Sequence, residues 1–209
     1  PQGDASLEGA EFTWKFYAGH YTADNLPSEP TKTWVTKTIA EKDSDGTIHY
    51  VSRLSDEYKV SGDSFYTQDG KNVLPLGTLT VEETKAPNGY LLDGAYMQAN
   101  GSEEQIKGMY LTQITEDGDI AVLSGSNQFS VSDEVIRGGV KIQKRDLETS
   151  DTKGQGSATL KDAEFEIISL NDNAVLVEGK LYSKNEVVKT ILTDIEGVAS
   201  TSADLLPYG

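Results

Sequence analysis

The amino-acid sequence predicts an all-β protein, and three observations support this fold class. Apolar residues alternate with polar ones over many short stretches, whereas the spacing of an amphipathic helix is scarce. Turn sequences that contain Gly, Pro, Asn or Asp separate these stretches. An eleven-residue segment also recurs 153 positions further along the chain, which is typical of a tandem array of one fold.

The first predicted strand lies within residues 1–19. Its apolar residues Phe12, Trp14 and Phe16 alternate with polar neighbours, as in a strand with one buried face. A polar, Pro-containing loop follows over residues 20–32. Further strands are expected at 33–39, 47–54, 60–67, 74–77, 109–114, 119–123 and 128–135, in addition to the strand that begins at Thr78.

The strand that begins at Thr78 carries a carboxylate where an apolar residue is expected. Leu79, Val81 and Glu83 share one face, and the turn sequence 86–89 ends the strand. A Glu on the core side must be paired, hydrogen-bonded or kept protonated by a raised pKa. The alternative is that the inner face ends at Val81 and that Glu83 lies at a wet edge.

Two motifs of the chain resemble a known family. The pattern Glu83-Thr84-x-Ala86-Pro87-x-Gly89-Tyr90 resembles the E-box of the B-type domains of Gram-positive collagen adhesins and pilins, and residues 7–12 resemble the L-x-G-A-x-F signature of their second strand. The resemblance implies tandem immunoglobulin-like, prealbumin-like β-sandwich domains. It also implies a buried Glu, here Glu83, which promotes a spontaneous isopeptide bond between a Lys on the first strand and an Asn or Asp on the last.

The expected acceptor of this bond is Asp133. Phe129, Val131 and Asp133 share the inner face of the strand at 128–135. In the family, the position ahead of a basic-Gly exit, here Arg137-Gly138, commonly holds the acceptor Asn. An Asp at this position departs from the common pattern, and some family members share the departure.

The expected lysine is Lys144. It shares a strand face with Val140 and Ile142, and Lys144-Arg145-Asp146 resembles the reactive-Lys strand of the family. The alternative is that Lys144 extends its ammonium group to solvent or pairs with an acid at the strand end.

The internal repeat divides the chain into two predicted modules. Residues 2–12 match residues 155–165 at seven of eleven positions, and Leu-Pro-x-Gly occurs at 74–77 and again at 206–209. We therefore expect a B-type sandwich over 1–137 that lacks its first strand. The start of a second repeat is expected over 138–209, truncated before its E-box strand.

Composition excludes several functional classes. The 209 residues and 36% hydrophobic content allow one or two domains with modest cores. No Cys is present, which excludes disulfides, thiolate nucleophiles and Cys-based zinc sites. The net charge of −16 argues against nucleic acid or an anionic membrane surface as partner, and solubility alone explains it. No cofactor is expected, and Asp43-x-Asp45-Gly46 is read as a turn because the calcium-loop register would need a Glu at Ser52.

An enzyme that turns over is not expected. The only histidines are His20 and His49, and neither a nucleophile-elbow Ser nor a phosphate-binding Gly loop is present. A hydrolase that uses Glu83 and Asp133 as paired carboxylates is the remaining enzymatic alternative. Isopeptide formation would instead run once per molecule, with burial keeping the Lys amine neutral and proximity supplying much of the acceleration.

The expected function is that of a structural stalk repeat in an extracellular, cell-wall-anchored adhesin or pilus-like protein. Its anchor and signal would lie outside these residues, and its partners would be neighbouring repeats. The alternative is an adhesin domain that binds a host matrix protein or glycan through the loop 20–32 or the acidic segment 41–57.

Head-to-tail strand complementation is a further expectation. Neither predicted module contains the Lys, the Glu and the acceptor together, and an unpaired edge is a template for a strand from elsewhere. Residues 139–146 of one chain could therefore complete the first module of the next, with Lys144 linked to Asp133. The alternative is a longer repeat protein in which each module has its own strand.

Overall fold

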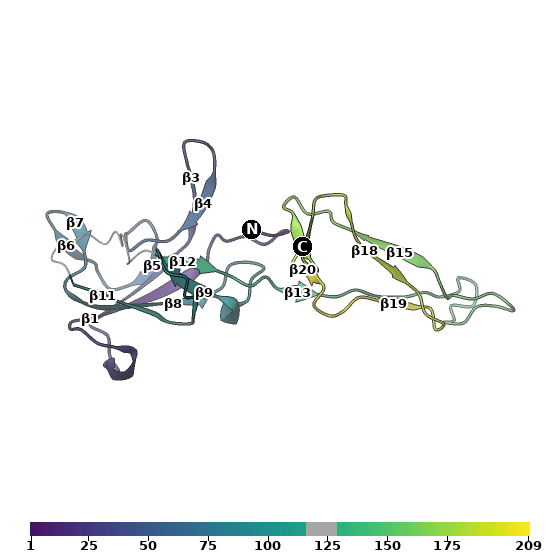
Figure 1. Cartoon of the computed structure of the whole chain (residues 1–209), viewed down its shortest axis with the longest axis horizontal. Coiled ribbons are helices and arrows are strands. Elements are labelled where there is room, and N and C mark those ends of the chain that lie inside the picture. The colour runs from purple at the N-terminus through teal and green to yellow at the C-terminus, as the bar shows by residue number, and fades with distance from the viewer. Residues whose placement is uncertain (116–128) are drawn as a thin grey trace. The chain divides into compact units, whose positions relative to one another are not determined.

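The computed structural model describes residues 1–115 and 129–209 (Figure 1). In these residues the predicted all-β class is confirmed, because the only helices are the 3-10 turns η1 (Ala23–Asn25) and η2 (Leu92–Gly94). No helix in the described ranges has the length and apolar character needed to cross a membrane. The predicted strand at 119–123 lies outside the described residues.

The chain forms two compact units. The large unit is Leu7–Glu134, and the small unit combines Pro1–Ser6 with Val135–Gly209. The predicted first module instead ran from 1 to 137. Pro1–Ser6 packs within the small unit because the side chain of Gln2 accepts a hydrogen bond from the Leu176 amide, at 2.9 Å, and the Gly3 carbonyl accepts one from Asn173, at 2.8 Å.

The large unit contains a five-stranded antiparallel sheet in the order β11-β8-β1-β2-β5. Its strands are β1 (Glu11–Tyr17), β2 (Lys32–Lys37), β5 (Lys59–Gly62), β8 (Gly77–Lys85) and β11 (Tyr110–Ile114). A second sheet has the order β10-β9-β12, with β9 (Tyr96–Ala99), β10 (Ile106–Lys107) and β12 (Phe129–Ser132). The hairpins β3 (Ile39–Lys42) with β4 (Ile48–Val51), and β6 (Tyr66–Gln68) with β7 (Lys71–Val73), complete the unit.

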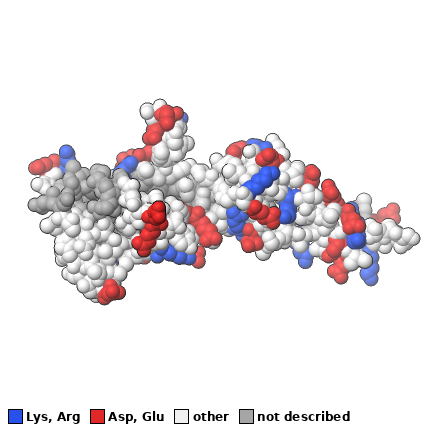
Figure 2. Space-filling model, viewed as in Figure 1, with Lys and Arg blue, Asp and Glu red and all other residues white. Residues whose placement is uncertain are grey.

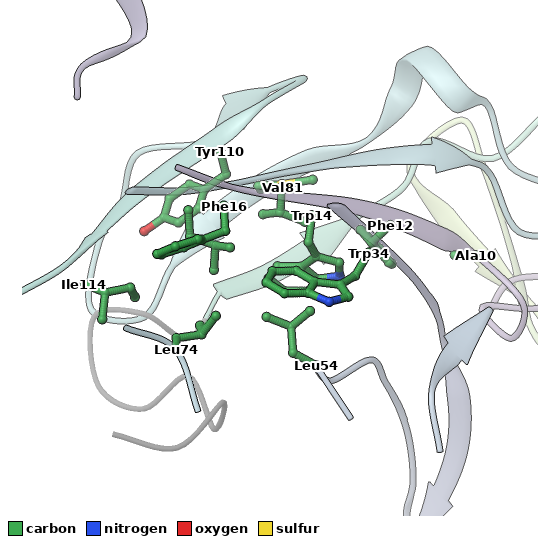
Figure 3. Close-up of a cluster of buried hydrophobic side chains, with 12 residues drawn as sticks. Ala10, Phe12, Trp14, Phe16, Trp34, Leu54, Leu74, Val81, Tyr110 and Ile114 are labelled. Carbon is green, nitrogen blue, oxygen red and sulfur yellow. The ribbon is translucent and has the colours of Figure 1, made fainter. Parts of the chain in front are cut away.

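The core of the large unit fills the space between these two sheets (Figure 3). Alternate residues of β1 point into it, and Phe12, Trp14 and Phe16 are buried as the alternation predicts. The centre of the Trp14 ring lies 5.8 Å from the centre of the Phe129 ring. Phe129 is partly buried against the core by this contact. This contact joins the two sheets, so the unit has the character of a β-sandwich.

The outer face of β8 is also covered. Thr78 and Thr80, which point away from the core, are buried. The hydroxyl of Thr78 accepts a hydrogen bond from the Tyr21 amide and donates one to the Gly19 carbonyl, both at 2.8 Å. The start of the predicted polar loop 20–32 therefore packs on β8, the strand between β11 and β1.

Two strand predictions are wrong in their bounds. The single strand expected at 60–67 is divided, because Gly62 has a φ of +104° and ends β5 before β6 begins at Tyr66. A Cβ at Gly62 would lie 2.3 Å from the Thr33 carbonyl oxygen, so no other residue fits there without a shift of the backbone. The strand expected at 74–77 is absent, since β7 ends at Val73 and β8 begins at Gly77.

The small unit consists of four two-stranded antiparallel pairs. These are β13 (Arg137–Gly138) with β20 (Leu206–Pro207), β14 (Lys141–Gln143) with β19 (Val198–Ser200), β15 (Glu164–Ile168) with β18 (Val187–Leu192), and β16 (Val175–Val177) with β17 (Lys180–Tyr182). Its core is small and comprises Val175, Val177, Val188 and Leu205.

Candidate functional site

Glu83 lies near the end of β8, on the face that points into the large unit. It pairs across the sheet with Phe12, a core residue, and side chains of directly paired residues lie on the same face. The register between the two strands shifts after this pair, since Glu11 pairs with Lys85 and not with Thr84. Thr84 lies on the outer face, where its hydroxyl is 2.9 Å from that of Thr13. The backbone thus turns Glu83 inward, as the alternation predicts.

Asp133 directly follows β12 and continues its inner face beyond Phe129 and Val131. Among the described residues, no hydrogen-bond partner satisfies either carboxyl oxygen of Glu83 or the Oδ1 atom of Asp133, and all three atoms are buried. Buried polar atoms are nearly always paired, so within the described residues these carboxyl groups depend on a proton shared between them, and the hydrogen bond between Glu83 and Asp133 contributes to their pKa shifts.

The buried environment of Glu83 and Asp133 keeps at least one proton on this pair of carboxyl groups. Burial, and then the negative charge of Asp133, raises the pKa of Glu83 from 4.5 to about 8. Burial also raises the pKa of Asp133. Desolvation disfavours the charged form of a carboxyl, and two adjacent carboxylates disfavour each other. At neutral pH the pair therefore holds at least one proton, and it can both donate and accept hydrogen bonds.

A cavity of about 670 Å³ in the large unit reaches this pair through Asp133, which lies in its wall. Its largest apolar side chains are Phe12 and Trp14 of β1, Phe129 of β12, and Leu54, and Val131 of β12 and Ala99 of β9 also line it. Within the described residues β12 pairs only with β9, so its other edge is unpaired. The cavity, the unpaired edge and the carboxyl pair are therefore parts of one site.

The lysines nearest in sequence to this region face away from it. Lys15 points outward from β1, and its Nζ atom lies 3.6 Å from Glu82. Lys85 bonds to Glu11 at 2.7 Å. Lys15 is thus directed away from the core, as its position in the strand predicts.

Lys144 belongs to the small unit. It directly follows β14, its side chain is half-buried, and its amide donates a hydrogen bond to the Gly197 carbonyl at 2.8 Å. The structure therefore brings together two of the three predicted site residues, Glu83 and Asp133, within one unit and holds the third in the other unit.

Sequence reasoning missed part of this site. β9, the partner of β12, was not predicted, because Tyr96–Ala99 is only four residues long and too short for a clear alternation. The cavity wall at residues 50–54 was read only as a strand. The sequence signal for this wall was the large apolar residue Leu54, which is 1% exposed in the structure.

Comparison with known proteins does not identify the chain. No model of a known protein family matches it, and no curated protein matches it. The resemblance of its two motifs to B-type adhesin and pilin domains therefore stays a prediction.

The raised pKa of Glu83 makes the stability of the large unit depend on pH. The folded state holds this proton up to about pH 8, whereas the unfolded chain loses it near 4.5. Between these values the folded state binds more protons, so the free energy of unfolding falls as the pH rises. The variant Glu83→Gln cannot ionise. These two pKa values correspond to about 3.5 kcal/mol between pH 5 and pH 8 for a fully buried group. Because Glu83 is only half-buried and solvent screens its charge, we expect the advantage of the variant over the parent chain to grow by about 2 kcal/mol.

Urea denaturation followed by tryptophan fluorescence measures this difference, because the only two tryptophans, Trp14 and Trp34, both lie in the large unit. Both proteins should carry Lys144→Ala, so that no cross-link complicates the comparison. Glu82→Gln, at the exposed neighbouring position, is the matched control. Parallel pH profiles for Glu83→Gln and its parent would contradict the assigned protonation.

Proposed function

We propose that the chain is a structural repeat module of a Gram-positive surface adhesin or pilus-like protein, built from immunoglobulin-like sandwich domains and strengthened by a Lys–Asp isopeptide bond. The two motifs and the internal repeat favour this class, and the sandwich character of the large unit is compatible with it. The observation that carries the proposal is the buried, unpaired Glu83–Asp133 pair beside a cavity and an unpaired strand edge.

The pair has the properties that amide condensation needs. A protonated carboxyl at Asp133 is a better electrophile than a carboxylate, since attack on a carboxylate must overcome its negative charge. A protonated Glu83 can donate a hydrogen bond to the Asp133 carbonyl oxygen and stabilise the charge that develops there. Burial raises the pKa of both groups, so the pair retains at least one proton that either carboxyl can carry.

The proposed reaction is balanced without a cofactor. The neutral Nζ amine of a lysine attacks Cγ of Asp133 and forms the C–N bond. Glu83 transfers a proton from the attacking nitrogen to the departing hydroxyl of Asp133, and the Cγ–O bond breaks. One water leaves, one amide remains, and Glu83 returns to its starting form. The acceptor is consumed, so the reaction occurs once.

A covalent bond of this kind would suit a stalk exposed to mechanical load. The chain has no Cys and so cannot use disulfides. A covalent cross-link restricts the unfolded chain, which for disulfides stabilises a domain by about 2–4 kcal/mol. An amide also resists reduction, unlike a disulfide.

Denaturing electrophoresis and intact mass of the purified full chain test the proposal. We expect a monomeric or multimeric species that lacks about 18 Da per link, the mass of the condensed water. Lys144→Ala should remove it, whereas Lys141→Ala, at an exposed position of the same strand, should not. A wild-type chain of unmodified mass after prolonged incubation would overturn the proposal.

A further inference from the structure

The cavity beside Asp133 has the features of an acceptor site for a β-strand. It is bounded by β1 and β12, and the outer edge of β12 carries backbone groups without a ladder partner in the described residues. An extended segment added there would form main-chain hydrogen bonds with β12 and place alternate side chains into the cavity. The unpaired carboxyl groups at one end require a donor or a cation.

We propose that this site binds residues 140–144 of a second copy of the chain and that Lys144 of that copy reaches Asp133. The inference rests on the proposed function for the bond itself. It adds the source of the lysine, and the direction and register of the strand that carries it.

The direction follows from where apolar residues lie. Along β12, the apolar cavity residues Phe129 and Val131 precede Asp133. The entering segment must therefore bring its apolar side chains to the Phe129 side and its amine to the Asp133 end.

The segment 140–144 has this pattern. Val140, Ile142 and Lys144 occupy alternate positions, and the lysine comes last. If the segment runs parallel to β12, Lys144 lies beside Asp133 while the two apolar side chains lie near Val131 and Phe129. In the antiparallel direction, Lys144 beside Asp133 would place both apolar side chains outside the cavity.

The same copy cannot supply this strand in that direction. Only residues 134–139 separate Asp133 from Val140. Parallel neighbours in a sheet need a connection of about a dozen residues or more, because the chain must return to the start of the first strand. A second copy has no such restriction.

The segment is held weakly in its own unit. It makes three register pairs with β19, and Val140 exchanges hydrogen bonds with Thr201. Val140 and Ile142 are only half-buried, and neither belongs to the core cluster of the small unit. Transfer to β12 would replace the lost ladder bonds by equivalent ones and would bury both apolar side chains further.

Charge favours the encounter between copies. The large unit carries nine Lys and Arg against 21 Asp and Glu, a net charge of −12. Figure 2 shows acidic side chains dispersed over its visible face. Residues 140–145 carry Lys141, Lys144 and Arg145 and no acidic residue. Complementary charge raises association rates, and the effect weakens with salt.

Two complementary variants of the full chain test the inference. Lys144→Ala keeps the acceptor site, and Asp133→Ala keeps the donor segment. Each variant alone should remain monomeric. Their mixture should give a dimer that survives boiling in detergent and lacks about 18 Da, and it should give no larger species, because each variant retains one half of the reaction. Dimer formation should slow at high salt.

Two substitutions in the donor segment test the direction and register of the added strand. In the Asp133→Ala donor, Ile142→Asp should abolish the dimer, because the parallel arrangement buries this side chain beside Val131. Gln143→Asp, with the same charge change at an exposed position, should leave dimer formation within about twofold. Equal yields from both donors would overturn the proposed direction and register. Circular dichroism and tryptophan fluorescence verify that each variant is folded.

The outcomes separate the inference from the proposed function. A mixture that stays monomeric, while the wild-type monomer lacks one water, overturns transfer between copies and keeps the isopeptide chemistry. A mixture that protects the amides of Phe129–Ser132 from hydrogen exchange but forms no covalent dimer supports strand docking and overturns the chemistry. A mixture with neither protection nor dimer overturns the inference.

Discussion

Replacing Glu83 with Ala is expected to leave the all-β fold intact and to slow cross-link formation at Asp133 by at least about 100-fold, the lower range for removal of a general acid–base group. Among the described residues, Glu83 is the group whose hydrogen bond and charge act on Asp133, so its removal leaves the polarisation of the Asp133 carbonyl and the proton transfer to the leaving hydroxyl without an assigned group. The loss of a buried, unpaired carboxyl should not destabilise the large unit. The time course of the cross-linked species on a denaturing gel measures the effect.

Glu82→Ala is the matched control, because Glu82 directly precedes Glu83 in β8 and points outward to Lys15. Its cross-linking rate should equal that of the wild type. Far-ultraviolet circular dichroism should show the same all-β spectrum for all three proteins. An unchanged rate in Glu83→Ala would remove Glu83 from the chemistry.

Replacing Trp14 with Ala is expected to lower the free energy of unfolding of the large unit by about 3–5 kcal/mol, the usual range for an aromatic residue removed from a core. Trp14 is 2% exposed and packs against Phe129 across the two sheets. Its indole N–H donates a hydrogen bond of 2.7 Å to the hydroxyl of Thr36. The variant therefore leaves a cavity at the wall of the proposed acceptor site and removes one of the two hydrogen bonds of the Thr36 hydroxyl, which keeps its bond to Ser52 at 2.7 Å.

Urea denaturation monitored through Trp34, the other tryptophan, measures this loss. Trp14→Phe retains much of the packing and loses the hydrogen bond, so it should be destabilised less than Trp14→Ala. Thr13→Ala, at the neighbouring outward position, should change the free energy of unfolding by no more than about 1 kcal/mol, the worth of its hydrogen bond to Thr84. A loss below about 1 kcal/mol for Trp14→Ala would contradict the central place of this residue in the core.

The sequence was most informative where one strand face is buried. Alternation placed Phe12, Trp14 and Phe16 in the core, and it turned Glu83 inward and Lys15 outward. These assignments succeed because a side chain in a strand has only two directions, so a few large apolar residues determine the register of their neighbours.

The sequence was least informative where distant contacts decide the structure. Pro1–Ser6 packs in the small unit through bonds to Asn173 and Leu176, more than 160 positions away. The cavity is formed by segments from β1, residues 50–54, residues 98–102 and β12. No local pattern encodes such a juxtaposition, so the carboxyl groups were predicted but the space beside them was not.

Intact mass of the cross-linked product tests the central claim most directly, in the wild type and in Asp133→Asn. If Asp133 is the acceptor, each link in the wild type should remove one water, about 18 Da, whereas each link in Asp133→Asn should remove one ammonia, about 17 Da, because the leaving group changes from hydroxyl to amide nitrogen. Peptide mapping should place both links between residue 133 and Lys144. A product that loses water in both proteins would assign the bond to another carboxyl, and unmodified masses in both would show that the Glu83–Asp133 pair forms no isopeptide bond.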